Sequence, residues 1–391
     1  MGIFSSPKKE KKLVAVFDVG SASVGGALFF MHKSGLPQII FSTREPIAFE
    51  EKLNPEKFLS LTMKSLEVVA SRVCTSGLGA PKQIFCVLSA PWYASQTRII
   101  TLEKNNLFTF TTKLADDLIK KEINFLEQEH KSKNKKSSHN LRHIELRSIK
   151  TLLNGYPTLE PIGKKARELE MSILVSMSPE QVLEKIEDVI SRHFHSKDVK
   201  YSSFNTAAFT VARDMLTHHE NFLLVDVGGE MTEVSLIKKD VLSESASFPL
   251  GRNFITRGVA KALNSSLGEA KSLISLYKDE HAHHATERKL APIINKLKNE
   301  WLKNFQQSLA SLSKDFSIPS VVFLTADSDM RAFFKEIIKA EQFHQYAFTE
   351  SKFQIAVLDT KALHGIATFK DDVTRDASLI IESVYLNNFL S

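Results

Sequence analysis

The sequence predicts an α/β protein made of two related halves, with an α+β module inserted into the first half. The main observation is an internal repeat, in which one apolar strand ends in Asp18-Val19-Gly20 and another ends in Asp226-Val227-Gly228. In both places a short polar turn, two further apolar strands and a helical segment follow. A repeat of this kind indicates two α/β units that share a topology and face each other.

The first half is expected over residues 13–83. Small residues in Ser21-Ala22-Ser23 stand between two apolar runs, which predicts a hairpin. Apolar residues at helical spacing predict a helix further along. The expected elements are strands at Leu13–Val19, Val24–Met31 and Gln38–Ser42, a helix over 55–73 and a following strand at Ile84–Leu88.

The inserted module is expected over residues 84–200. It combines β-branched or alternating segments with segments of helical periodicity, which is typical of an α+β unit. Its lysine-rich stretch 130–143 predicts a flexible basic loop. The expected elements are strands near Arg98–Leu102, Ile144–Leu152 and Leu169–Met177, and helices at Leu114–Leu126 and Val182–Phe194.

The second half is expected at residues 201–252 and 317–370, on both sides of a helical subdomain at 253–316. In that subdomain apolar residues recur every three to four positions between Leu290 and Leu309, which predicts a long amphipathic helix. The expected strands are Phe222–Val225, Val234–Ile237, Val241–Phe248 and Val321–Leu324.

Composition excludes several classes of protein. The chain has 391 residues, of which 43% are hydrophobic and 25% charged, and this excludes a wholly disordered protein. No apolar run approaches the roughly 18 residues of a membrane span, and the lysine-rich start does not resemble a secretion leader. Cys74 and Cys86 form neither a disulfide framework nor a CxxC site. We expect a cytoplasmic protein, or one held at the inner face of the membrane only through a partner.

The basic excess, 51 Lys and Arg against 45 Asp and Glu, is concentrated in residues 1–12 and 131–143. The rest of the chain is close to neutral, unlike a protein that binds specific nucleic acid through a basic face. We interpret 1–12 as a disordered basic N-terminus and both tracts as solvated, with contact to anionic lipid or nucleic acid as the alternative. The weakly acidic tail 371–391 is expected to pack on the first half rather than to anchor the chain on a membrane.

The two Asp-x-Gly turns predict a phosphate site. Glycine lets a ligand approach the main chain closely, and consecutive backbone N–H groups at such a turn bind phosphate oxygens. Two opposed hairpins of this kind can hold a polyphosphate from both sides. Asp18 and Asp226 at the strand ends are candidates to hold hydrated Mg²⁺, and Asp226 is also the candidate to orient an attacking water.

Four segments, at 18–29, 225–236, 247–263 and 321–330, together resemble the actin-like ATPases, and most closely the families of the bacterial cell-division protein FtsA and the pilus-assembly protein PilM. Residues 152–177 resemble the inserted subdomain of FtsA. The resemblance covers about residues 13–370. It implies an actin-like fold, a duplicated ribonuclease H-like architecture, with an FtsA-type inserted α+β subdomain, and it implies ATP and Mg²⁺ as ligands.

Carried over by position, the resemblance assigns nucleotide-binding residues in four places. Gly251 and Thr256 correspond to the segment before the helical subdomain. The residues expected to bind nucleotide are Asp18, Gly20 and Ser21 in the first hairpin, Asp226, Gly228, Gly229 and Thr232 in the second, and Thr325 and Ala326 in the nucleoside loop.

Departures from the family pattern predict weak nucleotide binding. Glu230, Met231 and Glu233 replace the third glycine, a threonine and the final aspartate of the second hairpin. Ala326 and Asp327 stand where the nucleoside loop has two glycines. A Cβ at 326 hinders passage of the nucleoside, and carboxylates at 230 and 327 are expected to repel phosphates. We expect ATP affinity to be lowered and hydrolysis to be slow or absent.

Three functions remain open on this evidence. The first is an ATP-binding scaffold for cell division or envelope assembly, able to self-associate into filaments. The second is a PilM-like adaptor that binds the cytoplasmic peptide of a membrane assembly partner. The third is a small-molecule kinase on the same fold, which lacks a recognisable substrate constellation.

Other candidate residues carry weaker signals. The histidines at 281, 283 and 284 have no accompanying cysteine and are interpreted as a polar loop rather than a metal site. Ser89 is not in a nucleophile elbow, and Cys86 is expected to be a buried apolar residue. Trp92 and Tyr93 are expected in the core, with an exposed partner surface as the alternative.

Overall fold

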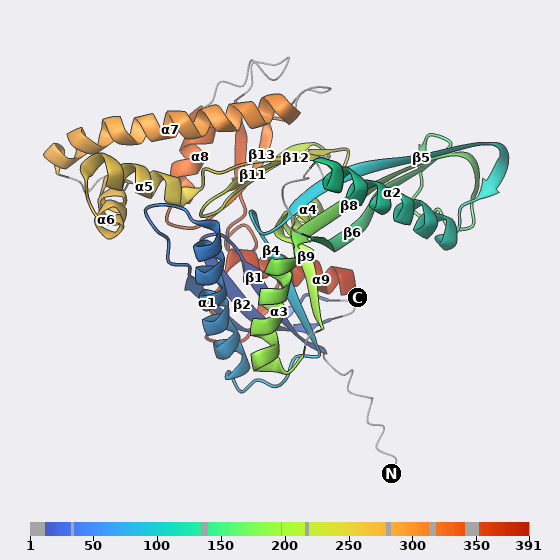
Figure 1. Cartoon of the computed structure of the whole chain (residues 1–391), viewed down its shortest axis with the longest axis horizontal. Coiled ribbons are helices and arrows are strands. Elements are labelled where there is room, and N and C mark those ends of the chain that lie inside the picture. Colours follow the sequence, from blue (N-terminus) through green and yellow to red (C-terminus); the bar gives the residue numbers. More distant parts are fainter. Residues whose placement is uncertain are drawn as a thin grey trace, which may run out of the picture.

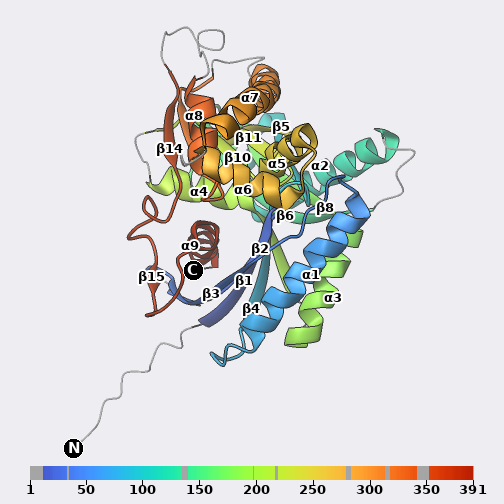
Figure 2. The ribbon, with the colours of Figure 1, turned by 90° about the vertical axis from the view of Figure 1, so that its left-hand side faces the viewer.

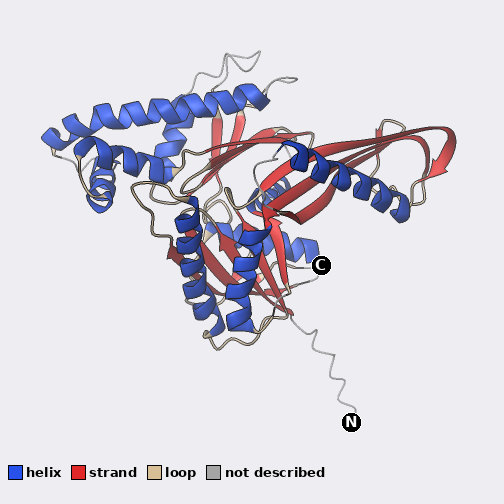
Figure 3. Ribbon diagram, viewed as in Figure 1, coloured by secondary structure: helices blue, strands red, loops and turns tan. Residues whose placement is uncertain are grey.

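The computed structural model describes residues 12–32, 35–133, 140–196, 198–215, 219–278, 283–312, 318–340 and 352–390. Within these ranges the chain forms three sheets, one in each half and one in a projecting arm (Figures 1 and 3). Within the described ranges, no helix is long and apolar enough to cross a membrane.

The sheet of the first half has the strand order β15-β3-β2-β1-β4-β9. The antiparallel meander that begins it contains the first Asp-Val-Gly turn, and the strands added beside β1 are parallel. Its strands are β1 (Lys12–Val19), β2 (Ser23–Met31), β3 (Gln38–Pro46), β4 (Gln83–Leu88), β9 (Val199–Ser203) and β15 (Thr368–Phe369).

Two helices, α1 (Pro55–Cys74) and α3 (Glu180–Phe194), pack together on one face of this sheet (Figure 2). The side chain of Asn54 caps α1 by accepting from the backbone N–H of Lys57 at 3.0 Å. Proline at the first helical position suits the helix start because its missing N–H would be unpaired there.

The sheet of the second half has the order β12-β11-β10-β13-β14, and its first three strands repeat the antiparallel meander of the first half. The second Asp-Val-Gly turn follows β10, just as the first follows β1. Its strands are β10 (Phe222–Val227), β11 (Thr232–Lys238), β12 (Val241–Phe248), β13 (Val321–Ala326) and β14 (Gln354–Val357).

Helices cover the outer face of the second sheet. Trp301 on the long helix is fully buried, stacks on Phe305 and donates its indole N–H to the carbonyl of Leu250 at 3.1 Å. The helices on this side are α5 (Arg252–Leu263), α6 (Leu267–Lys278), α7 (His284–Leu312) and α8 (Arg331–Ala340).

The two halves share one core, which lies between their sheets. Helices α4 (Phe204–Met215) and α9 (Ala377–Leu390) occupy this layer and contact each other (Figure 2). Strand alternation explains the arrangement, because Val14 and Val16 of β1 face this layer while their neighbours face α1 and α3. The C-terminal helix therefore completes the first half and joins it to the second.

The arm contains the inserted sheet, of order β5-β8-β6-β7, and one helix that covers a single face (Figure 1). Its elements are β5 (Ala94–Thr109), α2 (Thr112–Lys133), β6 (Leu141–Leu153), β7 (Tyr156–Pro157) and β8 (Lys165–Pro179). The separate sheet thus spans residues 94–179.

The expected boundaries of the insertion differ from those of the sheets. Residues 84–88 and 199–203 lie within β4 and β9 of the first sheet, whereas 84–200 were expected in the module and 201–203 in the second half. Helix α3 packs against α1 of the first half. The reason is that β4 and β9 pair with each other in parallel across the whole insertion, and such long-range pairing leaves no local pattern.

Candidate nucleotide cleft

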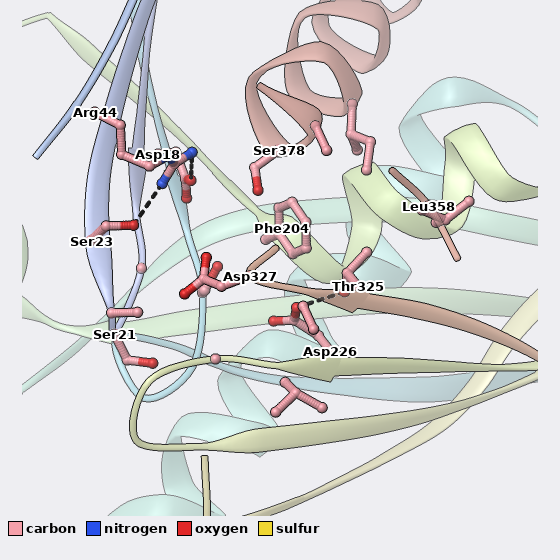
Figure 4. A pocket seen from close by; sticks show the side chains of 18 residues that line it. Asp18, Ser21, Ser23, Arg44, Phe204, Asp226, Thr325, Asp327, Leu358 and Ser378 are labelled. Atoms are coloured by element: carbon pink, nitrogen blue, oxygen red, sulfur yellow. Dashed lines mark hydrogen bonds and ion pairs between the residues drawn. The ribbon is translucent and has the colours of Figure 1, made fainter. Parts of the chain in front are cut away.

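The duplicated turns meet between the two halves. Asp18 pairs with Val87 across the parallel β1–β4 ladder, and Asp226 pairs with Thr325 across the equivalent β10–β13 ladder. Both carboxylates line a single cavity with a volume of about 70 Å³. Figure 4 shows Asp18 and Arg44 on one wall, with Asp226 and Thr325 on the opposite wall. The two carboxylates therefore share one gap, as the duplication predicted.

Most of the predicted residues border this cavity. Thr232 does not, because it is fully buried behind the loop, where it donates to the carbonyl of Leu250 at 2.8 Å. Gly229 instead contacts the first hairpin directly. The predicted residues that line the cavity are Asp18, Gly20, Ser21, Asp226, Gly228, Thr325 and Ala326.

The two hairpins are in direct contact. The hydroxyl oxygen of Ser21 accepts hydrogen bonds from the backbone N–H groups of Gly229 at 2.9 Å and Glu230 at 3.2 Å. A Cβ on Gly229 would lie 2.3 Å from the carbonyl oxygen of Ser21, so only glycine fits this approach. Backbone donors that could bind a phosphate are thus already bound by the chain itself.

A guanidinium group occupies the place expected for the cation. Arg44 of β3 donates to Asp18 at 2.7 Å, to Asp376 at 2.5 and 2.9 Å, and to the hydroxyl of Ser23 at 2.9 Å. Gly25 makes room for it, since a Cβ there would lie 2.7 Å from a guanidinium nitrogen. We call Asp18, Arg44 and Asp376 the clasp.

Burial and pairing act differently on the two acids of the clasp. Burial raises the pKa of Asp18, although the charge of Arg44 opposes the shift. Burial also acts to raise the pKa of Asp376, but Arg44 holds it below the ordinary value. Asp376 precedes α9 and accepts from the backbone N–H of Leu379 at 3.0 Å, so the clasp ties the C-terminal helix to the first hairpin.

Asp226 is held by the second half alone. Thr325 donates its hydroxyl to the carboxylate at 2.6 Å. Burial raises the pKa of Asp226 to about 7; the Thr325 hydrogen bond opposes this shift, and the charges of Asp18 and Asp327 add to it. The surroundings of Asp226 therefore disfavour its charged form as long as no cation lies beside it.

This pKa predicts how stability depends on pH. The folded protein keeps a proton that the unfolded chain releases near pH 4, so the stabilisation is complete below that pH and is lost as the pH rises through about 7. Asp226→Asn should therefore match wild type at pH 4 and be about 4 kcal/mol more stable at pH 8. Urea unfolding at both pH values measures this, with the exposed Asp371→Asn as control. Equal gains at both pH values would contradict the assignment.

Ion pairs separate this cavity from a second hollow of about 100 Å³ beside α5 and α6. Arg252 pairs with Asp327 at 2.8 Å and with Asp329 at 3.1 Å. Asp327 lines the first cavity, while Arg252 and Asp329 line the second. Thr256, predicted to lie near the nucleotide, borders the second hollow. A ligand that spanned both hollows would have to displace these pairs.

Glu230 does not face the cavity, which corrects the expectation that it repels phosphates. Its carboxylate accepts from Arg257 at 2.6 and 2.7 Å and from the side-chain amide of Asn253 at 2.8 Å. Arg257 also donates to the backbone carbonyl of Glu50, so these contacts connect α5 with the first half. The Glu230 carboxylate therefore holds Arg257, and the hydrogen bond from Arg257 to Glu50 connects the two halves.

Glu233 has a similar structural role. It accepts from the phenol of Tyr93 at 2.8 Å and from the amide of Asn205 at 3.0 Å, which joins the start of the arm to α4 and β11. Burial raises the pKa of Glu233 to about 7.

Tyr93 is buried, as is Trp92, which stacks on Phe58 and donates to the carbonyl of Gly20 at 2.8 Å. Both aromatics therefore lie in the core.

The structure also locates the serine, cysteine and histidine residues that carried weaker signals in the sequence. Ser89 borders the cavity, and Cys86 is fully buried. His283 and His284 are exposed, and residue 281 lies outside the described residues. Within the described part of the chain, no group of three or more His, Cys, Asp or Glu is arranged to hold a metal ion.

As arranged, the cleft does not fit ATP and Mg²⁺. Sites for drug-sized ligands occupy about 300–1,000 Å³, whereas this cavity measures about 70 Å³. The loop N–H donors are bound by Ser21, Asp18 is bound by Arg44, and Arg252 crosses the path toward the second hollow. A nucleotide would need the hairpins to separate and both sets of ion pairs to open.

Sequence reasoning missed the clasp. Arg44 lies 26 positions from Asp18 and 332 from Asp376, so spacing could not connect them. One signal was present, because Gly25 and Gly26 stand inside a mostly apolar strand and indicate a close approach.

Comparison with known proteins identifies the fold. The family model described as cell division protein FtsA matches residues 223–383. A chain of the PilM-PilN type IV pilus biogenesis complex superposes with a TM-score of 0.59 at 11% identity, covering 96% of this chain and 97% of that chain. No curated protein sequence matches.

Two further solved structures are similar at lower scores. The MamK double helical filament has a TM-score of 0.47 at 8% identity, covering 97% of this chain and 98% of that chain. A protein from Bacteroides thetaiotaomicron with an actin-like ATPase fold and unknown function has a TM-score of 0.41 at 8% identity, with 99% of each chain covered. The expected fold class, an actin-like ATPase fold, is confirmed.

Proposed function

We propose that this member of the actin-like ATPase superfamily, which resembles FtsA and PilM, is a scaffold that acts through protein contacts and binds ATP weakly or not at all. The observation that carries the proposal is the direct contact between the two hairpins, with Ser21 bound to the N–H groups of Gly229 and Glu230. Opening the cleft costs these hydrogen bonds and the pairs around Arg44 and Arg252 before any phosphate is bound.

Hydrolysis is disfavoured for the same reasons. Asp226 is the candidate to orient an attacking water, but its carboxylate is bound by Thr325, and burial raises its pKa to about 7, so about half of it carries a proton at neutral pH. Asp18, the other candidate metal ligand, is committed to Arg44. With the cleft closed, we propose that the outer surfaces of the fold carry the function. The same closed cleft disfavours the small-molecule kinase.

The cellular role that we propose is assembly of the division machinery or of another envelope structure. The match of residues 223–383 to the FtsA model supports it. The partners would be division or envelope-assembly proteins, with filament formation as one mode of action. A cytoplasmic location follows from that role, with attachment to the inner face of the membrane through a partner.

Calorimetric titration with ATP and Mg²⁺ tests the proposal, together with phosphate release and sedimentation. We expect no saturable binding below about 1 mM, no phosphate release, and the same sedimentation with and without ATP. Ser21→Ala frees the two loop N–H groups and should raise ATP affinity above that of wild type. Ser89→Ala, which also borders the cavity, is the control. Micromolar binding or turnover by wild type would refute the closed cleft.

A second candidate function, a PilM-like adaptor, is favoured by a specific groove. A hollow of about 610 Å³ lies between the uncovered face of the arm sheet and β12 of the second half. Both β5 and β12 are edge strands of their sheets, as far as the described strands show, and edge strands can bind an extended peptide. The neighbour in the pilus complex supports such a role. Peptide arrays of cytoplasmic tails separate the adaptor from the scaffold. An adaptor should bind such peptides as wild type and lose that binding in Ile99→Arg, a substitution in the groove.

A further inference from the structure

The far end of the arm exposes several large apolar side chains. Leu159 is 101% exposed, Tyr156 75%, Ile162 66% and Leu107 60%. Elsewhere among the described residues, Ile99 and Phe389 expose large apolar side chains to a similar extent, at 62% and 57%. Large apolar residues gathered on one exposed surface mark an interaction site, whereas single scattered ones do not.

The topology brings these four residues to one end. Tyr156 pairs with Leu153 across a two-residue turn at the end of β6. The loop after β7 closes on the end of β5, since the N–H of Gly163 donates to the carbonyl of Phe110 at 2.8 Å. We call residues 103–113 and 154–168 the arm tip. It lies at the outer end of the strands and helix that project from the body in Figure 1.

The arm tip is also basic. Exposed basic side chains exceed acidic ones by five to three, and Lys104 places its ammonium 5.6 Å from the ring centre of Phe108. The basic residues are Lys104, Lys113, Lys164, Lys165 and Arg167, and the acidic ones are Glu103, Glu160 and Glu168. Apolar side chains mixed with lysine and one tyrosine match the chemistry of a bilayer interface that carries anionic headgroups.

The shape of the tip favours a bilayer over a peptide ligand. Leu159 and Ile162 project from the loop after β7, Tyr156 lies in β7 and Leu107 near the end of β5, and all four side chains are 60–101% exposed. Gly155 and Gly163 have positive φ values of 79° and 84°, and a Cβ on either would meet nothing within 4 Å, so both turns stand free in solvent. We infer that the arm tip is a membrane-contact site that inserts Leu107, Tyr156, Leu159 and Ile162 into the interface of an anionic bilayer. This inference is independent of whether the cleft binds nucleotide.

Co-sedimentation of the full chain with vesicles tests this. Wild type should bind vesicles of phosphatidylglycerol and phosphatidylcholine, and bind pure phosphatidylcholine less. The double variant Leu159→Gln, Ile162→Gln should lower the partition coefficient about tenfold. Leu53→Gln, at a residue 51% exposed in the first half, is the matched control and should bind as wild type does.

A fluorescent reporter locates the contact. Tyr156→Trp adds an exposed tryptophan to Trp92 and Trp301, which are 5% and 0% exposed and supply a constant background. Its emission should shift to the blue on addition of anionic vesicles and be quenched by brominated lipid. The inference is overturned if wild type stays in the supernatant. It is also overturned if the double variant binds equally well, because binding would then belong to the lysine tracts. A third contrary result is that wild type pellets without vesicles and the double variant does not, which would make the tip a protein contact.

Discussion

Replacing Arg44 by methionine is expected to lower the free energy of unfolding by about 3 kcal/mol. The substitution keeps much of the side-chain volume but leaves Asp18 and Asp376 without their shared cation. The side chains of these acids are only 5% and 19% exposed, so water can replace little of the lost interaction. Breaking a buried pair from one side costs more than the pair contributes, because the remaining charge stays desolvated. Urea unfolding followed by circular dichroism measures the change.

Arg72→Met is the matched control. Arg72 pairs with Glu45, the residue next to Arg44, at 2.9 Å, but its side chain is 47% exposed. Exposed pairs contribute about 0–1 kcal/mol, so this variant should stay close to wild type. Adding Asp18→Asn to Arg44→Met should recover part of the loss, because the unpaired charge is then removed. Equal effects of Arg44→Met and Arg72→Met would show that the clasp is not a buried unit.

Gly229→Ala is expected to lower the free energy of unfolding by about 2–3 kcal/mol. The new methyl group would lie 2.3 Å from the carbonyl oxygen of Ser21 and 2.8 Å from the Cα of Ala22. Both obstacles are backbone atoms, which cannot move aside as a flexible side chain can. The hairpins must separate, and the hydrogen bond from Gly229 to the Ser21 hydroxyl is lost with them.

A glycine in open space provides the comparison for this steric effect. The nearest atom to a Cβ on Gly268 of α6 would be 4.0 Å away, so Gly268→Ala should be neutral or slightly stabilising. Neither glycine has a left-handed backbone, so the two substitutions differ in the space available rather than in conformational strain. Thermal unfolding of both variants measures the difference. Equal melting temperatures would mean that the hairpins are not in contact in solution.

Local patterns in the sequence predicted much of the fold. The two Asp-Val-Gly turns and their strands were recognisable because each hairpin is continuous in the chain and alternates between two buried faces. The long helix α7 was recognisable from the apolar period that buries Leu290, Ile294 and Trp301 on one face. These features depend on neighbours within a few turns or one hairpin.

What the sequence could not predict depends on contacts between distant segments. The membership of β4 and β9 in one sheet depends on pairing across the whole arm. The state of the cleft also depends on distant contacts. The predicted residues do meet there, but they are bound by residues that belong to no recognisable sequence motif. Arg44 and Arg252 are single basic residues whose roles follow only from the acids that folding brings beside them.

The shared core has a consequence for how the protein is made. Helix α9 follows every other described element in the chain, yet it covers one face of the sheet that begins with β1. A nascent chain on the ribosome therefore displays that apolar face from the time the first strands emerge until translation reaches α9. Domains generally fold in the order of synthesis, but here the first half must wait until α9 has been synthesised. Chaperones that hold unfinished chains are thus expected to matter more for its yield than for that of a protein whose first domain closes on itself.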